Sequence, residues 1–499
     1  MNKFAKLLGY DAVEKKTSVK TEIIAGIVTF LAMAYILTVN PNQILYASTA
    51  DPRWSSLFIA TAFGAIIGTL LMAFLAKMPL AQASGMGLNS LVGTIIGGGV
   101  GAYSVYVFHF TIGQAFAMVL ISGIIFLLLS VITIKGKTFR ELVFDGMPVP
   151  VRSAISVGIG LFIAYIGFQN AGVIVGNQYT QVALADFTNW DTCKPAVVAL
   201  IGLFLIAILD KLNVKGSVIL GILGATVIGI PFGVTNVKVI TGTEGISWKF
   251  WENFANFFTV GEDSVFGSFT SVFTDGFPAG SLFTVIMLII TMCMIDMFDT
   301  LGTIVGCCGG NRVLSDENNK PHNYGKIMLS DAVATCAGAA LGTSTVTTFV
   351  ESGAGVSAGG RTGLTAFTTA CMFLLAIFAM PLFAMIPSAA TAAALIYVGV
   401  LMMKNNVKSV DFGNAINATT AFLTIVVMVL SYSITKGIGI GMLSYTVMSA
   451  IAYLVELIKF KLTKKGEGEE VEAPKWNVSV VALIVTALFI VYFFVPTVV

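Results

Sequence analysis

The most constraining feature of the sequence is a series of long apolar runs that recurs along the whole chain. A membrane-spanning helix needs about 20 predominantly apolar residues, and many of these runs are that long. Hydrophobic residues make up 56% of the chain and charged residues only 11%, whereas a soluble domain carries about 25% charged residues. We therefore predict an all-α polytopic membrane protein. A soluble enzyme, a disordered chain and a secreted disulfide scaffold are excluded.

Charge and metal-binding residues narrow the function classes further. The net charge is only +2, which gives no support for nucleic acid as a partner. The chain has two histidines and six cysteines, without an HExxH or a CxxC pattern. We interpret the cysteines as small core residues. The sequence therefore predicts no metal site, no cofactor and no enzymatic activity.

The apolar runs define fourteen predicted segments, separated into seven and seven by a gap at 235–278. A further apolar run at 477–497 either crosses the membrane once more or lies in the interface. The fourteen predicted segments are 19–40, 56–77, 86–98, 111–134, 150–172, 195–211, 215–234, 279–306, 326–342, 350–360, 366–386, 388–403, 416–433 and 438–458.

Basic residues orient the chain, because cytoplasmic loops carry an excess of Lys and Arg. Four lysines precede the first segment and a fifth, Lys20, lies at its start, and most other basic residues fall in loops on that same side. We predict a multi-pass protein of the cell membrane with a cytoplasmic N-terminus at 1–18. The gap at 235–278 is then an extracytoplasmic loop, and 459–499 is a cytoplasmic charged linker followed by the apolar tail. The basic residues on the cytoplasmic side include Lys3, Lys6, Lys15, Lys16, Lys20, Lys135, Lys137, Arg140, Arg312, Lys320, Lys459, Lys461, Lys464 and Lys465.

The two halves, 19–234 and 279–458, are predicted to be inverted repeats. Seven is an odd number, so the second half enters the membrane from the side opposite to the first. The third segment of each half is short and rich in glycine. Interrupted segments at matching places in two halves are typical of a transporter binding site near the bilayer midplane. We predict broken helices in spans 3 and 10, with breaks near Gly87 and Gly353.

Two carboxylates lie inside span 8. Asp296 and Asp299 are the only Asp, Glu, Lys or Arg residues in 279–306. Each costs about 2.5–3.5 kcal/mol at the centre of a membrane helix on insertion scales. They stand about 60° apart on a helix, so both can face one cavity. Asp296 shares its helical face with Thr300 and Thr303.

Further polar residues occur in the broken segments and beside them. Glu351 lies in the second broken segment, Asn89 in the first, and Asp331 in span 9. These carboxylates either form structural hydrogen bonds between helices or bind protons, cations or ligand donors, since no Lys or Arg lies in the interior of these spans. Carboxylates and an amide suit a flat polar ligand with N–H edges. They suit an anion poorly, and we interpret Arg361 as a cytoplasmic topology residue.

Five phrases of the sequence carry a family resemblance: TFLAMAYILTVNP (29–41), SGMGLNS (84–90), SVGIGLFIAYIGFQNAG (156–172), IDMFDTLGTIVG (295–306) and TSTVTTFVESGAGVSAGGRTGLTA (343–366). They closely resemble the AzgA-like branch of the nucleobase–cation symporter-2 transporters, which are purine permeases. The resemblance runs from about 17 to 460. It leaves out the long loop at 235–278 and the tail.

The resemblance implies a uracil-transporter-like fold of seven plus seven inverted segments. A core domain would hold spans 1–4 and 8–11, and a gate domain spans 5–7 and 12–14. The substrate would bind between them, against short extended stretches before the half-helices of spans 3 and 10. Expected substrates are guanine, hypoxanthine and adenine, imported with protons through an elevator-like motion. A homodimer through the gate domains is also implied.

The resemblance places the family's span-8 acid on Asp296, with Asp299 as a second contributor. It places the span-10 acid on Glu351 and the span-3 polar residue on Asn89. The candidate substrate-binding residues are Glu351, Asp296, Asn89, Asp299, Phe349 and Thr303, and the candidates for proton coupling are Asp296, Glu351 and Asp331. An anion transporter of the same fold, similar to sulfate carriers, is the alternative function. It should place a basic residue beside the half-helix of span 10, where this chain has Glu351.

Overall fold

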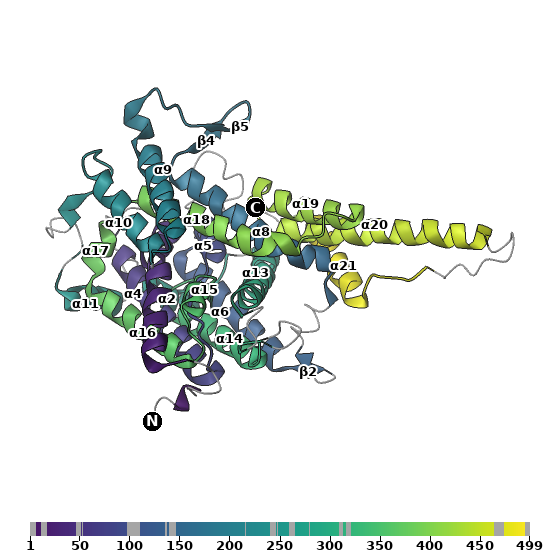
Figure 1. Ribbon diagram of the computed structural model, residues 1–499, viewed down its shortest axis with the longest axis horizontal. Coiled ribbons are helices and arrows are strands. Elements are labelled where there is room, and N and C mark those ends of the chain that lie inside the picture. The colour runs from purple at the N-terminus through teal and green to yellow at the C-terminus, as the bar shows by residue number, and fades with distance from the viewer. Residues whose placement is uncertain are drawn as a thin grey trace. The chain divides into compact units, whose positions relative to one another are not determined.

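In the residues that it describes, the computed structural model is built of helices and three short strand pairs (Figure 1). Several of the basic residues that predict the orientation of the chain lie outside the described residues, including Lys3, Lys15, Lys135, Arg140 and Lys464. Arg312, Lys320 and Lys465 also lie outside them. The structure describes residues 6–10, 17–45, 51, 53–96, 110–134, 137–138, 146–214, 216–239, 246, 248–258, 265–278, 280–308, 313–315, 321–463 and 474–494.

The first half follows the predicted order of spans, with one difference: span 1 is divided at Ala34–Tyr35 into two helices. Span 3 is broken as predicted and consists of a strand followed by a short helix. The elements are α2 (Val19–Met33), α3 (Ile36–Leu45), α4 (Arg53–Leu71), the π-helical turn η1 (Met72–Ala76), β1 (Gln82–Ser84), α5 (Met86–Ile96), α6 (Ile112–Val131), β2 (Thr133–Ile134), β3 (Lys137–Thr138), α8 (Val149–Asn170), β4 (Ile174–Asn177), β5 (Gln181–Leu184), α9 (Trp190–Lys211) and α10 (Ser217–Gly229).

The second half begins with one continuous helix, α13 (Leu282–Cys308), where the first half has two. Its span 10 is also a strand followed by a short helix, and the tail forms a last apolar helix. The elements are α13 (Leu282–Cys308), α14 (Tyr324–Ala340), β6 (Val346–Thr348), α15 (Ser352–Ser357), α16 (Gly363–Phe378), α17 (Met380–Ala384), α18 (Ser388–Asn406), η3 (Val407–Ser409), α19 (Ala415–Leu430), α20 (Ile434–Thr463) and α21 (Val480–Phe494). Among the described residues, seven helices are long and apolar enough to cross a membrane, and six shorter apolar helices accompany them.

Helices of the two halves interleave. The α2 helix packs against α16, α6 packs against α14, and α4 contacts both α14 and α16 (Figure 1). Gly26 shows why α2 and α16 can lie so close: a Cβ atom at this position would stand 2.5 Å from the carbonyl oxygen of Thr365. Small residues at helix interfaces allow such close approach in membranes. Pairing between halves therefore brings spans 1, 2, 4, 8, 9 and 11 together.

The gap at 235–278 is more structured than a polar loop. It contains η2 (Val237–Val239) and two aromatic-rich helices, α11 (Phe250–Phe258) and α12 (Val265–Asp275). The α11 helix packs on α4 and α12 packs on α6, and Gln114 on α6 donates to the carbonyl oxygen of Gly276 at 2.8 Å. Hydropathy missed these helices because each is apolar on one side only and is shorter than a membrane span.

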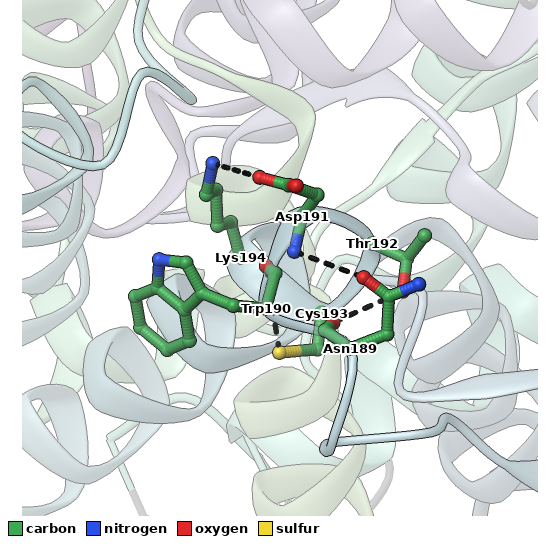
Figure 2. Close-up of polar contacts among 6 residues, drawn as sticks. All are labelled: Asn189, Trp190, Asp191, Thr192, Cys193 and Lys194. Carbon is green, nitrogen blue, oxygen red and sulfur yellow. Dashed lines mark hydrogen bonds and ion pairs between the residues drawn. The ribbon is translucent and has the colours of Figure 1, made fainter.

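The α9 helix begins five residues before the predicted start of span 6. Asn189 is its N-cap, and the side-chain oxygen of Asn189 accepts from the backbone N–H of Asp191 at 3.2 Å. Lys194 lies 2.7 Å from the carboxylate of Asp191, one turn along the helix (Figure 2). An N-cap satisfies amide groups that would otherwise lack partners. The helix therefore extends through a polar segment that an apolar run does not reveal.

The chain forms two compact units. The first comprises residues 1–131 and 163–400 and holds both broken segments with the helices around them. The second comprises residues 132–162 and 401–497, in which the first part of α8 packs with α19 and α20 packs with α19 and α21. The assignment of spans to a core and a gate domain stays a prediction.

Candidate functional site

A two-stranded antiparallel sheet joins the two broken segments. Gln82 pairs with Thr348, Ala83 with Thr347 and Ser84 with Val346. The ladder is extended by a hydrogen bond from the backbone N–H of Gly85 to the carbonyl of Thr345 at 2.9 Å. Each strand leads directly into a short helix, α5 or α15, and these two helices begin at opposite ends of the sheet. The predicted helix breaks near Gly87 and Gly353 are confirmed.

Glu351 lies immediately before α15 and is buried. One carboxylate oxygen, Oε1, accepts a hydrogen bond from the hydroxyl of Tyr35. The other oxygen, Oε2, is buried and has no hydrogen-bond partner among the described residues. A buried acceptor without a partner is costly. Glu351 therefore has one carboxylate oxygen that can accept a hydrogen bond from a ligand.

Tyr35 was not among the residues selected from the sequence. It is fully buried at the junction of α2 and α3, and its hydroxyl also lies 3.6 Å from the sulfur of Met86, the first residue of α5. The motif that contains Tyr35, at 29–41, indicated only the family resemblance. Tyrosine in an apolar span is ordinary, so no local signal indicated that this hydroxyl meets Glu351.

Asn89 connects the two halves through its side chain. The hydroxyl of Ser344 donates to Oδ1 of Asn89, and Nδ2 of Asn89 donates to the carbonyl of Ser84 at 3.4 Å. Asn40, which sequence reasoning also missed, lies in a neighbouring network. Its Nδ2 donates to Oγ1 of Thr343 at 2.8 Å. Uncharged polar side chains therefore surround the end of the sheet where α5 begins.

The two aspartates of α13 have different surroundings. Asp296 is buried, and Oγ1 of Thr335 donates to its Oδ2 at 3.1 Å. Asp299 is only partly buried. It faces the start of α5, since a Cβ atom at Gly85 would lie 3.7 Å from its Oδ2. Asp299 also lies within electrostatic range of Asp331 and Glu351. The structure thus gathers three predicted carboxylates around the sheet.

Asp331 is fully buried and holds the sheet to its neighbours. Its Oδ2 accepts from the hydroxyl of Thr300 on α13 at 2.7 Å. Its Oδ1 accepts from Nε2 of Gln82 on β1 at 3.0 Å and from the hydroxyl of Thr348 on β6 at 3.3 Å. One carboxylate therefore ties two strands and two helices together, which is the geometry of a positioning group.

The remaining predicted residues line the same region. Phe349 is buried, and its backbone N–H donates to the carbonyl of Ala81 at 3.0 Å. Thr303 is buried on α13, one turn beyond Asp299. The thiol of Cys307, a further turn along, donates to the carbonyl of Val350 at 3.4 Å. The last turns of α13 therefore contact the extended segment that leads into α15.

Arg361 lies at the far end of α15 from Glu351. Its guanidinium donates to the carbonyls of Val356 and Gly360, at 2.5 and 2.7 Å. Its backbone N–H donates to the carboxylate of Glu22 at 3.0 Å. Glu22 is a buried acid that was not predicted from the sequence. The cationic group of Arg361 therefore caps the C-terminal end of the half-helix instead of facing the carboxylates.

Comparison with known proteins decides the family. Residues 20–440 match the sequence profile of a group described as the permease family. The chain belongs to this family. The guanine/hypoxanthine permease PbuO of Bacillus subtilis is 35% identical over 440 residues, which cover 88% of this chain and 93% of that protein. The adenine permease AdeQ of Escherichia coli is 35% identical over 433 residues, which cover 87% of this chain and 88% of AdeQ.

The fold is shared with distant transporters. The transmembrane domain of the cyanobacterial bicarbonate transporter BicA superposes with a TM-score of 0.57 at 16% sequence identity, covering 85% of this chain and 97% of that domain. At this identity the likeness concerns the fold alone. The predicted inverted-repeat transporter fold and the family resemblance are both confirmed. This permease is a multi-pass membrane transporter and not an enzyme.

Proposed function

We propose that this permease imports purine nucleobases by proton symport. The observation that carries the proposal is Glu351, a buried carboxylate with one oxygen held by Tyr35 and the other without a partner in the part of the chain that the structure describes. Guanine and hypoxanthine each present an N–H at N1, which can donate to such an oxygen. The names of relatives, which include guanine/hypoxanthine and adenine permeases, support the same substrate class.

Proton coupling is assigned first to Asp296, with Glu351 and Asp331 as further candidates. A carboxylate in the interior of a membrane protein is typical of proton relays. Asp296 meets the hydroxyl of Thr335, a partner that can donate to the charged form or accept from the protonated form. Asp331 already accepts hydrogen bonds from Gln82, Thr300 and Thr348, so its assignment is secondary.

An elevator-like motion fits the way in which the site is built. Glu351 and Asn89 follow the two strands of the β1–β6 sheet, which links the two halves of the chain, and Asp299 faces the start of α5 beside it. A site held by such a network moves as one body more easily than it deforms. Alternating access would then carry the bound base past the gate domain, and the predicted homodimer would hold the gate domains in place.

Transport of an anion is not favoured. An anion needs a basic group or an equivalent set of donors at its site, whereas Arg361 is engaged at the opposite end of α15.

The decisive experiment is uptake of radiolabelled hypoxanthine, guanine and adenine by a purine-transport-deficient strain that expresses the permease. We expect saturable uptake that a protonophore abolishes. Uptake of sulfate or bicarbonate without purine uptake would contradict the proposal.

Orientation in the membrane has a test of its own. We expect a single cysteine at position 137 to be cytoplasmic, and one at position 251, in the α11 helix, to be extracytoplasmic, because Lys and Arg concentrate on the N-terminal side. A membrane-impermeant maleimide applied to intact cells should label only position 251, in a background without the native cysteines. Both positions should react once the cells are permeabilised. Labelling of position 137 in intact cells would contradict the predicted orientation.

A further inference from the structure

We propose that Tyr35 is a specificity-determining residue, because it occupies one of the two oxygens that Glu351 could offer to a ligand. This inference rests on the proposed function. The hydroxyl of Tyr35 donates to Oε1 of Glu351, while Oε2 keeps no partner among the described residues. The carboxylate therefore presents one unpartnered acceptor oxygen instead of two.

The position of Tyr35 is firmly set. Its side chain is fully buried, and the backbone leaves it by a tight turn in which the N–H of Thr38 donates to the carbonyl of Tyr35 at 3.0 Å. The hydroxyl also lies 3.6 Å from the sulfur of Met86. Tyr35 thus contacts the residue that precedes α15 and the first residue of α5, so it positions Glu351 relative to both half-helices.

The number of donors on the ligand edge decides what this arrangement selects. Hypoxanthine presents one N–H, at N1, and this single donor satisfies the unpartnered oxygen. Guanine presents a second donor beside it, the exocyclic amine. This donor gains less at the other oxygen, because Oε1 already accepts one hydrogen bond from Tyr35 and keeps only one further acceptor position. Without the hydroxyl, guanine could satisfy both oxygens, whereas hypoxanthine would leave one buried oxygen unsatisfied.

The test is Tyr35→Phe, which keeps the ring and removes the hydroxyl. We expect the ratio of the KM for hypoxanthine to the KM for guanine to rise by about fivefold or more. General damage would impair uptake of both bases alike and leave this ratio unchanged. The matched control is Tyr397→Phe, which removes a hydroxyl from another buried tyrosine, on α18, and should leave the ratio as in the wild type.

Two outcomes would overturn the inference while leaving purine transport intact. One is wild-type uptake of both bases with a KM ratio that Tyr35→Phe does not change. The other needs no variant: a guanine affinity more than about tenfold above that of hypoxanthine in the wild-type protein, since the second guanine donor should gain little from Glu351. Absence of purine uptake by the wild type would instead contradict the proposed function itself.

A second inference, independent of substrate, concerns the apolar tail. We infer that α21 crosses the membrane antiparallel to α20. Gly439 on α20 lies against Phe489, where a Cβ atom would stand 2.6 Å from the ring. Further along α20, the hydroxyls of Thr446 and Thr486 are 3.0 Å apart. The contacts therefore run from the start of α20 toward its end while they run from the end of α21 toward its start, so the two helices are antiparallel. The two helices pack side by side (Figure 1).

Two more contacts continue this register to the start of α21. The ring centroids of Tyr453 and Trp476 are 5.2 Å apart in an edge-to-face arrangement. Tyr and Trp are enriched at the membrane–water interface. The hydroxyl of Ser479 donates to the carbonyl of Gly146 at 2.5 Å, just before α8. The start of α21 is therefore level with the beginning of span 5, on the side where the basic residues concentrate.

The surface of α21 excludes a helix that lies in the interface. Such a helix has one polar face. The one threonine of α21, Thr486, is buried against α20. Among the side chains of α21 that the structure describes, those that are exposed are apolar. At about 1.5 Å per residue, α21 covers much of the bilayer core. Its exposed side chains are Val480, Leu483, Ile484, Leu488, Ile490, Val491 and Phe494.

Fusions at two positions test the crossing. Alkaline phosphatase is active only outside the cytoplasm, and green fluorescent protein exported by the same route does not fluoresce. We expect a fusion after Thr463 to report the cytoplasmic side and a fusion after Val499 to report the opposite side, with both reporters. Two fusions that report the same side would overturn the inference. The result does not depend on which substrate is carried.

Discussion

Replacing Glu351 by glutamine should reduce purine affinity by roughly 10- to 100-fold, the effect of losing one charge-assisted hydrogen bond. Tyr35 determines how the new amide orients. The amide oxygen accepts from the hydroxyl of Tyr35, so the NH₂ group takes the place of the unpartnered Oε2. A donor then faces the N–H edge of the base, where the wild type has an acceptor. Equilibrium binding of guanine and hypoxanthine to the purified permease measures the loss.

The matched control for this change is Asp299→Asn, a second replacement of a carboxylate by an amide beside the same sheet. It should weaken binding less than Glu351→Gln, because Asp299 is assigned a secondary contact with the base. Thermal unfolding of both variants in detergent separates lost binding from lost folding. Wild-type affinity in a folded Glu351→Gln variant would remove Glu351 from the recognition of the base.

Replacing Asp296 by asparagine should separate binding from accumulation. Asparagine mimics the protonated carboxyl group, and its oxygen can still accept from the hydroxyl of Thr335, so the local packing is kept. The variant cannot release a proton. Exchange of labelled for unlabelled base should therefore persist within a few-fold of the wild-type rate, whereas uphill accumulation should fall to the level seen with a protonophore.

Proteoliposomes with an imposed pH gradient provide the measurement for Asp296→Asn. The wild-type permease should accumulate hypoxanthine only while the gradient lasts, and the variant should reach the same level with or without it. Gradient-dependent accumulation by Asp296→Asn would move the coupling role to another carboxylate. Asp299 and Asp331 would then be the next residues to replace, and Asp331 is the one whose loss should also disturb the sheet, through Gln82 and Thr348.

Hydropathy by itself located most of the helices. The α13 helix, Leu282–Cys308, covers the apolar run at 279–306, and α18, Ser388–Asn406, covers the run at 388–403. Lipid has no hydrogen-bonding groups, so a chain that crosses it must form long apolar helices with their backbone groups satisfied internally. Because the other spans are long and apolar, the two short, glycine-rich segments differ clearly from them. This difference located the two broken segments.

The tertiary structure decided which polar groups meet. Tyr35 and Glu351 are 316 positions apart in sequence, and the three residue pairs of the β1–β6 sheet join the two halves of the chain. Such contacts depend on how the spans pack, for which a single sequence has no periodic signal. A three-residue strand is too short to show alternation. The apolar runs therefore determined where the chain crosses the membrane, and packing between the halves decided which carboxylate oxygen is left for a ligand.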